Sequence, residues 1–389
     1  MNPFDNIVFE LALIFVGVSV LATVFLYLRQ PIILAYIGLG MLVGPWGLRV
    51  IQDPAHIEQI SHIGIILLMF LIGLNLNPQK LLRLLRSTAM ITLSTCTVFV
   101  IAAMLLTRVL GFLWWDSFLV GLALMFSSTV VGLKLMPTST LHQKHMGEVM
   151  ISILLVQDML AIMVILLLYG AAGDSIHLQG AWLLVKTVAI FLLEWLTIRY
   201  GLLRLLRRFD VIQDYVFLIS LGWCLLCAEA AHLLGISYEI GAFTGGVTLG
   251  TSPIALVIAE GLKPIREFFL ILFFFSIGAQ FDFLVTKDVV LPGLLLATLL
   301  VALKPVAFWG AFRLGGEQPK PSLELGLRLG QASEFSILVA YSALEAGRVE
   351  AKTSYLIQLT VILTFIASTY LVVYKYPTPI GLSKGIRRD

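Results

Sequence analysis

Long apolar runs separated by short polar stretches form the main pattern of this chain. Apolar runs of about 17–25 residues are long enough to cross a bilayer as α-helices. The sequence predicts thirteen such helices, at residues 7–28, 31–48, 61–76, 88–110, 117–136, 147–171, 181–202, 213–234, 237–257, 266–284, 290–313, 323–346 and 353–375. The pattern therefore predicts an all-α, polytopic membrane protein.

Basic residues fall unevenly on the loops between these predicted helices. Loops on one side, together with the C-terminal tail, carry 18 of them: Arg29, Lys80, Arg83, Arg86, Lys134, Lys144, Arg199, Arg204, Arg207, Arg208, Lys263, Arg266, Arg313, Lys320, Lys375, Lys384, Arg387 and Arg388. The opposite side carries five: Arg49, Arg108, Lys287, Arg348 and Lys352. Cytoplasmic loops are enriched in Lys and Arg. We therefore expect the N-terminus outside, the C-terminus in the cytoplasm, and a location in the inner (plasma) membrane.

The chain also contains a weak internal repeat. The segment 70–77, Phe-Leu-Ile-Gly-Leu-Asn-Leu-Asn, returns 205 positions later as Phe-Ser-Ile-Gly-Ala-Gln-Phe-Asp at 275–282. The first copy lies in the third predicted helix and the second in the tenth, so the two halves would enter the membrane in opposite orientations. Inverted repeats of this kind are typical of secondary transporters and place the substrate site near the bilayer midplane. We expect two inverted six-helix repeats, with the seventh helix as a linker.

Composition agrees with this class of protein. The chain has 389 residues, of which 59% are hydrophobic and 13% charged, whereas soluble proteins carry about 25% charged residues. The net charge of +3 comes from the loop bias, so we expect no nucleic-acid partner. The sequence shows no nucleophile–base pair, metal cluster or phosphate-binding loop. We therefore expect no enzymatic activity and no cofactor besides the transported ions.

Asp158 stands near the middle of the sixth predicted helix, and no other charged residue follows Glu148 in that helix. Ionisable groups at bilayer depth are costly and usually face a cavity or a partner. Burial disfavours the charged form of a carboxyl group, so such a group can exchange a proton near neutral pH. It can instead bind a desolvated monovalent cation. Asp158 is therefore the expected shared site for a cation and a proton; the alternative is a structural Asp bonded to a neighbouring helix.

Hydroxyl residues in the fifth predicted helix indicate a break at mid-depth. Ser127, Ser128 and Thr129 are flanked by β-branched residues and glycine. Broken membrane helices are tolerated where their backbone groups line a cavity, and there the carbonyls and the Thr129 hydroxyl would be hard ligands for an alkali cation. The expected ion-binding residues are therefore Asp158, Gln157, Thr129, Ser128 and Ser127. Such hydroxyl residues also pack helices together. The repeat offset places Ala332, Ser333 and Glu334 of the twelfth helix over these three positions, which favours a break in both helices.

Glu334 and Lys304, together with Ser333, are expected to support the charges of this region. Glu334 would lie near the ends of the broken halves, where the positive end of a helix dipole stabilises a carboxylate. Lys304 lies near the centre of the eleventh predicted helix, before Pro305. It is too deep to reach the interface easily, so it should have a carboxylate or a dipole as its partner.

The whole chain resembles the monovalent cation–proton antiporter superfamily, in the branch that contains Kef-type potassium efflux systems and the sodium/proton antiporter NapA. The matching features are Leu155-Val156-Gln157-Asp158, the repeats around Gly73 and Gly278, Gly241-Ala242-Phe243, Ser127-Ser128-Thr129, Glu334-Phe335 and Lys304. The resemblance implies a NapA-like fold with crossed, broken helices in the fifth and twelfth spans. It also implies a homodimer whose core moves as an elevator.

The resemblance assigns parts of the chain to roles. Residues 7–86 and 213–286 correspond to the panel and dimer part, 181–205 to a linker helix, and 88–171 with 290–376 to the ion-transporting core. Kef systems carry a cytoplasmic nucleotide-binding domain, which residues 1–389 do not include. The expectation is a single membrane domain, with regulation by a separate subunit as one possibility.

The resemblance also assigns the ion-binding carboxylate of the family to Asp158. Its preceding neighbour is Gln157, where sodium-handling relatives have Asp or Asn. A single titrating carboxylate favours K⁺ over Na⁺ and exchange without net charge. In relatives with two Asp residues the deep lysine pairs with the first one; here Lys304 lacks that partner.

Potassium (or sodium)/proton antiport is therefore the leading hypothesis. A gated, channel-like potassium efflux protein is the first alternative, although the sequence has no Thr-Val-Gly-Tyr-Gly filter. A sodium-coupled organic-anion symporter of a related fold is the second. It would not require a lone Gln-Asp pair in the middle of a span.

Overall fold

The computed structural model describes residues 7–51, 55–75, 78–136, 145–170, 176–209, 212–252, 254–282, 287–376 and 378. All the elements in this part of the chain are helices. They form two compact units. Unit 1 comprises residues 1–17, 36–82 and 169–280, and unit 2 comprises 18–35, 83–168 and 281–389. Helices α1 (Ile7–Tyr27) and α2 (Ile32–Val43) contribute to both.

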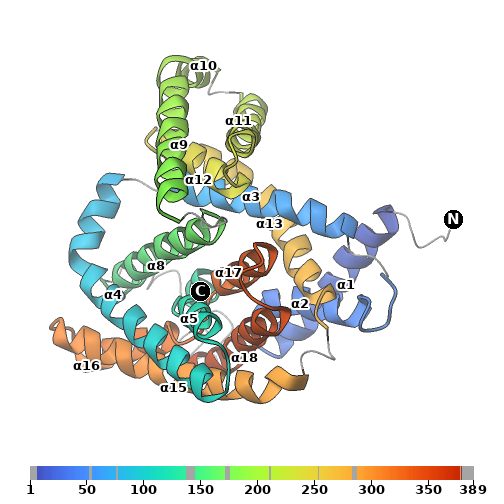
Figure 1. Ribbon diagram of the computed structural model, residues 1–389, viewed down its shortest axis with the longest axis vertical. Helices are drawn as coiled ribbons and strands as arrows, with labels where there is room; N and C mark the ends of the chain where they lie inside the picture. Colours follow the sequence, from blue (N-terminus) through green and yellow to red (C-terminus); the bar gives the residue numbers. More distant parts are fainter. Residues whose placement is uncertain are drawn as a thin grey trace. The chain divides into compact units, whose positions relative to one another are not determined.

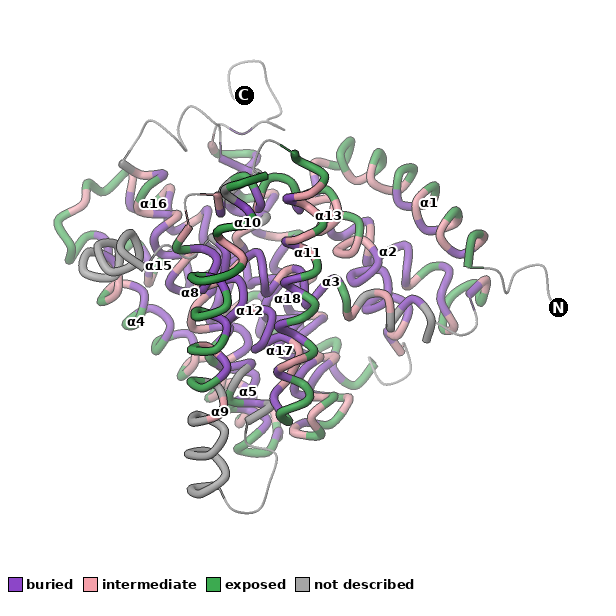
Figure 2. The backbone as a smooth tube through the Cα atoms, turned by 90° about the horizontal axis from the view of Figure 1, so that it is seen from above, coloured by how far each residue is buried: buried purple, intermediate pink, exposed green. Residues whose placement is uncertain are grey.

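Unit 1 is built around α3, which packs along α12 and α13 (Figure 1). Its helices are α3 (Ala55–Asn75), α9 (Ile176–Thr197), α10 (Leu203–Phe209), α11 (Gln213–Leu233), α12 (Tyr238–Gly250) and α13 (Ala255–Ala279), with a π-helical turn, Ile198–Leu202, between α9 and α10. Helix α12 packs on α9 and α11 as well as on α3. Most of its residues are buried, as Figure 2 shows.

Glycines of the repeated segments hold these helices backbone to backbone. A methyl group on Gly73 of α3 would lie 2.3 Å from the carbonyl oxygen of Phe243 in α12. A methyl group on Gly278 of α13, its repeat mate, would lie 2.1 Å from the carbonyl oxygen of Ile37 in α2. Real Cβ atoms do not approach that closely, so only glycine permits either contact. Each repeated glycine thus contacts a helix from the other half of the sequence.

Unit 2 contains the predicted ion-site residues and the remaining helices. They are α4 (Pro78–Val109, from residue 83 onward), α5 (Trp114–Leu124), α6 (Thr129–Lys134), α8 (His145–Gly170), α15 (Val290–Leu314, after a 3₁₀ turn at Lys287–Val289), α16 (Pro319–Arg328), α17 (Glu334–Glu345) and α18 (Ala351–Lys375). Helix α18 packs on α5, α15, α16 and α17. Helices α17 and α18 are buried along most of their length (Figure 2).

Several helices are suited by length and composition to a membrane. Six qualify among the described residues: Ile7–Tyr27, Thr88–Val109, Met146–Ile165, Gln213–Leu233, Lys287–Leu314 and Ala351–Lys375. The chain is therefore a multi-pass membrane protein. The count of thirteen crossings remains a prediction, and the predicted basic tail at 379–389 lies outside the described residues.

Two helices extend beyond the apolar runs that predicted them. Helix α4 begins at Pro78 rather than at residue 88, because Pro suits the first helical turn and the Leu, Lys and Arg residues that follow are good helix formers. Helix α13 begins at Ala255 and runs through Pro264, although a loop was predicted between 257 and 266. Glu260 and Lys263 are exposed there. These polar residues extend the helix beyond its apolar run, so the run alone did not predict its start.

Candidate functional site

The predicted break in the fifth span is present. Helix α5 ends at Leu124, the chain is irregular through Phe126–Ser128, and α6 begins at Thr129. The Ser128 hydroxyl accepts a hydrogen bond from the backbone N–H of Val131 at 3.0 Å. A serine side chain thereby satisfies one of the N–H groups that a helix leaves free in its first turn. Local sequence therefore explains why the helix restarts here.

A second break interrupts the twelfth predicted span. Helix α16 ends at Arg328 and α17 begins at Glu334. The Ser333 hydroxyl accepts a hydrogen bond from the Phe335 N–H at 3.1 Å, while the Ser333 N–H donates to the Ser336 hydroxyl at 3.3 Å. This is a capping box, in which two side chains close the start of a helix. It places the buried Glu334 in the first turn of α17, where a carboxylate is favoured.

The two breaks contact each other. The Ser127 hydroxyl donates to the carbonyl oxygen of Leu329 at 2.8 Å. The Gln331 side-chain amide donates to the carbonyl oxygen of Ser128 at 3.4 Å. The side-chain oxygen of Gln331 in turn accepts from Ser368 of α18 at 3.0 Å. Ser127, Ser128 and Gln331 are fully buried, so these bonds replace the partners that water would otherwise supply.

Lys304 of α15 joins both breaks from the side. Its ammonium group donates to the carbonyl oxygen of Phe126 at 2.5 Å and to that of Gln331 at 3.1 Å. It also lies 5.3 Å from the centre of the Phe99 ring. The two carbonyls follow the C-terminal ends of α5 and α16, where helix dipoles are negative. The expected dipole partner of Lys304 is therefore a pair of half-helix ends.

Gln157 holds the first break from α8. Its side-chain oxygen accepts a hydrogen bond from the Ser127 N–H at 2.9 Å. Its amide nitrogen lies 3.7 Å from the sulfur of Cys96 in α4, as donor to it. Gln157 is fully buried. Both ends of this side chain are therefore occupied by protein groups next to Asp158.

Asp158 lies beside the start of α6. The Thr129 hydroxyl is 3.2 Å and 3.3 Å from the two oxygens of its carboxyl group, as donor to them. Asp158 is 8% exposed. Among the described residues, Thr129 is its one hydrogen-bond partner, and no basic side chain forms a salt bridge with it. Glu334 is near enough to interact with it electrostatically.

The site thus separates charges along the broken helices. The ammonium group of Lys304 lies at the negative ends of α5 and α16. The carboxyl groups of Asp158 and Glu334 lie near the starts of α6 and α17. A buried carboxyl group with a hydroxyl beside it can hold a proton, and its oxygens are hard ligands that suit an alkali cation. Three serine hydroxyls are instead engaged in hydrogen bonds within the breaks and the helix cap: those of Ser127, Ser128 and Ser333.

Some residues of this arrangement carried no clear signal in the sequence. Cys96, Phe99 and Gln331 are ordinary members of apolar segments when only the sequence is read. Arg328 is 1% exposed and donates to the carbonyl oxygen of Leu135 at 2.7 Å, just past the end of α6. It also forms a salt bridge with Glu324 at 2.8 Å. Arg328 therefore ties α16 to α6.

Thr129→Val tests whether the hydroxyl beside Asp158 contributes to cation binding. Valine keeps the shape of threonine but removes the oxygen. Loss of a buried polar partner costs about 1–3 kcal/mol, so we expect the apparent KM for the cation to rise about tenfold to hundredfold, with a smaller change in maximal rate. The measurement is cation-driven proton movement in proteoliposomes over a range of cation concentrations.

Thr360→Val is the matched control for that experiment. Thr360 is buried in α18, and its hydroxyl donates to the Leu356 carbonyl oxygen of its own helix. This substitution should leave the apparent KM unchanged. An equal rise in KM for both variants, or no rise for Thr129→Val, would contradict a role of the Thr129 hydroxyl at the ion site.

Comparison with known proteins identifies relatives of the whole chain. Glutathione-regulated potassium-efflux system protein KefC of Salmonella heidelberg (strain SL476) is 30% identical over 371 residues, which cover 92% of this chain and 58% of that protein. The protein of the same name from Klebsiella pneumoniae (strain 342) is 30% identical over 377 residues, covering 93% of this chain and 59% of its own length. The chain therefore spans about three fifths of the curated relatives that it matches.

A solved structure shares the fold. The sodium proton antiporter MjNhaP1 from Methanocaldococcus jannaschii, at pH 8, matches with a TM-score of 0.64 and 19% identity, over 93% of this chain and 94% of that one. A family model described as "Sodium/hydrogen exchanger, transmembrane" matches residues 12–373. The match extends over both helix breaks, Lys304 and Asp158. The chain belongs to the transmembrane sodium/hydrogen exchanger family.

Proposed function

We propose that this chain is a secondary transporter that exchanges a monovalent cation, K⁺ in preference to Na⁺, for H⁺. The observation that carries the proposal is the buried carboxyl group of Asp158, which has the Thr129 hydroxyl beside it and no salt bridge among the described residues. Burying a carboxylate without a cation is costly. The cost is avoided when the group holds either a proton or a metal cation, and one site that takes only one of them at a time couples their movements.

The identity of the relatives supports a monovalent cation as the substrate. Two relatives are named as potassium-efflux system proteins and the structural neighbour is named as a sodium proton antiporter. Gln157 favours K⁺ and exchange without net charge, because it is neutral and leaves Asp158 as the one titrating member of the Gln-Asp pair. Its hydrogen bonds to Ser127 and Cys96 position the break, so it would tune the site through the shape of the backbone.

The reciprocal glycine contacts support the expected inverted repeat. Gly73 contacts α12 and Gly278 contacts α2, so each copy of the repeat contacts the other half of the sequence. We infer alternating access by an elevator movement of the core part, with residues 7–86 and 213–286 as the panel and dimer part of a homodimer. The inferred location is the inner membrane, with the N-terminus outside and the C-terminus in the cytoplasm. A separate regulatory subunit is compatible with this arrangement.

The proposal is tested by reconstituting the chain in proteoliposomes that contain a pH-sensitive dye. An outward or inward gradient of K⁺ should move protons in the opposite direction, Na⁺ should do so less effectively, and choline should have no effect. Clamping the membrane voltage with valinomycin should leave the proton movement unchanged if the exchange is electroneutral. K⁺ flux without proton movement would favour the channel-like alternative, and no flux of either ion would contradict the proposal.

A further inference from the structure

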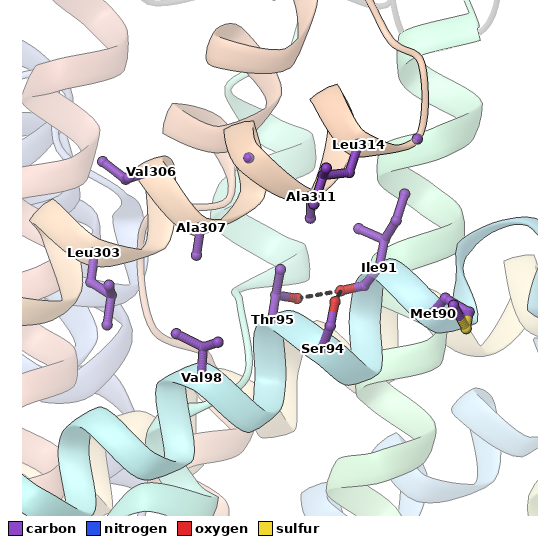
Figure 3. A pocket seen from close by; sticks show the side chains of 12 residues that line it. Met90, Ile91, Ser94, Thr95, Val98, Leu303, Val306, Ala307, Ala311 and Leu314 are labelled. Carbon is purple, nitrogen blue, oxygen red and sulfur yellow. Dashed lines mark hydrogen bonds between the residues drawn. The ribbon is translucent and has the colours of Figure 1, made fainter.

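A groove runs between α4 and α15 in unit 2 (Figure 3). Its volume is about 670 Å³, which lies in the range of about 300–1,000 Å³ typical of small-molecule sites. Helix α4 lines it with Ser94 and Val98, among others, and α15 lines it with Ala307, Gly310 and Ala311. The small residues of α15 leave the space between the two helices open.

The lining of the groove offers almost nothing to a polar ligand. The hydroxyls of Ser94 and Thr95 both donate to the Ile91 carbonyl oxygen of their own helix, at 3.0 Å and 2.8 Å (Figure 3). The other side chains that line it are aliphatic, apart from the thioether of Met90. An occupant must therefore be apolar where it lies in the groove, because a polar group would lose its hydration there without gaining a partner.

The groove opens onto surfaces that suit a bilayer. Helices α4 and α15 both include candidate membrane spans. Side chains at the groove are strongly exposed: Met90 is 83% exposed, Val306 is 62% exposed and Leu314 is 93% exposed. In a membrane, hydrocarbon chains of lipids would contact such side chains. A flexible acyl chain can follow the space that the small residues of α15 leave between the two helices.

Arg313 places a positive charge near one end of the groove. Ile91 and Gly315 mark this end, since a methyl group on Gly315 would lie 3.5 Å from the Ile91 side chain. Arg313, in the last turn of α15, is exposed there and donates one hydrogen bond to the Glu317 carbonyl oxygen. Loop charges place this end on the cytoplasmic side, where anionic lipids gather.

We propose that an acyl chain of an anionic phospholipid occupies the groove, with its headgroup beside Arg313. The apolar lining fits the chain, and the exposed guanidinium of Arg313 at one end fits a phosphate group. The lipid would come from the cytoplasmic leaflet.

The groove also lies next to the candidate ion site. Its lining residues Thr95, Val98 and Leu303 are each followed in the sequence by a residue of that site: Cys96, Phe99 and Lys304. An acyl chain between the outer faces of α4 and α15 therefore sets the separation of the helices whose inner faces hold Gln157 and both breaks. If the proposed transport function is correct, occupancy of the groove changes the transport rate.

Lipid binding can be measured independently of transport. The intact chain is purified in nanodiscs that contain trace amounts of phosphatidylglycerol or phosphatidylcholine with a photoactivatable acyl chain, and the labelled peptides are mapped by mass spectrometry. Phosphatidylglycerol should label residues 90–98 and 303–315. Arg313→Gln should reduce this labelling about fivefold, the effect of about one basic charge near a membrane. Equal labelling by phosphatidylcholine would overturn the headgroup assignment.

Gly310→Leu tests the acyl-chain part of the proposal. No atom lies within 4 Å of the position of a Cβ on Gly310, so leucine fits the helix and fills the groove. Excluding several methylene groups should reduce labelling at these peptides about tenfold or more. Gly222→Leu is the matched control, because Gly222 is an exposed glycine of α11 with the same open space, and its labelling should equal that of wild type.

Two outcomes separate this inference from the transport proposal. Unchanged labelling in Gly310→Leu would overturn the groove as a lipid site whatever the transport assay shows. Labelling that is lost as expected in a chain that moves no ions would confirm the lipid site and contradict the transport proposal instead.

Discussion

Asp158→Asn should abolish cation-driven proton movement. Asparagine keeps the size of the side chain and can still accept a hydrogen bond from Thr129, but it neither releases a proton nor carries a charge for a cation. Removal of a proton-transferring group typically costs about 10²–10⁴ in rate, so we expect a loss of at least about a hundredfold. The measurement is dye-reported proton movement in proteoliposomes driven by K⁺ and by Na⁺.

Glu148→Gln is the control for that experiment. Glu148 lies in the same helix, α8, but is exposed in its first turn. This substitution also removes one carboxylate and should leave exchange near the wild-type rate. Both variants should elute from size-exclusion chromatography as wild type does. Substantial exchange by Asp158→Asn would remove the basis of the proposed mechanism.

Lys304→Met should strongly destabilise unit 2. The ammonium group donates to the carbonyl oxygens of Phe126 and Gln331, and it is fully buried. Methionine fills similar space but leaves both carbonyls unsatisfied, each at a cost of about 1–3 kcal/mol. The expected loss is therefore about 2–6 kcal/mol in the free energy of unfolding. The measurement is the midpoint of thermal unfolding in detergent, with transport assayed in parallel.

Lys186→Met is the control, because it shows how much the loss of a lysine outside the helix breaks lowers the unfolding midpoint. Lys186 of α9 also donates to a helix-end carbonyl oxygen, that of Leu234 at 2.8 Å, but in an exposed position. Water can replace that bond, so its loss should lower the midpoint only slightly. Equal midpoints for the two variants would show that Lys304 does not stabilise the breaks as the geometry indicates.

The breaks were predictable because their causes are local. Hydroxyl residues next to glycine compete with helical hydrogen bonds and cap new helices, and Ser128 and Ser333 do so here. The buried position of Asp158 was predictable for a similar reason, since it follows from one charged residue in an apolar run. Glu334 at the start of α17 followed from its repeat relation to Thr129.

The hydrogen-bond partners of Lys304, unlike the helix breaks, could not be predicted from local sequence. They are backbone carbonyls, which every residue carries, and only the meeting of two irregular segments makes these two available. The contact of Gln157 with Cys96 could not be predicted from the sequence either, because it depends on how α4 packs against α8. Helix ends were also missed where polar residues extend a helix beyond its apolar run, as in α4 and α13.

The exchanged glycine contacts of unit 1 bear on the order in which the protein is assembled during synthesis. The contact of Gly73 in α3 cannot form until α12 has been synthesised, and the contact of Ile37 in α2 cannot form until α13 has been synthesised. Ribosomes add about 5–20 residues per second, so on the order of ten seconds separates each helix from its partner. During that time Gly73 lacks its backbone contact with α12. If a mutation prevents synthesis of the second half, the first half therefore lacks its partner helices, and we expect it to be degraded by the cell's proteases.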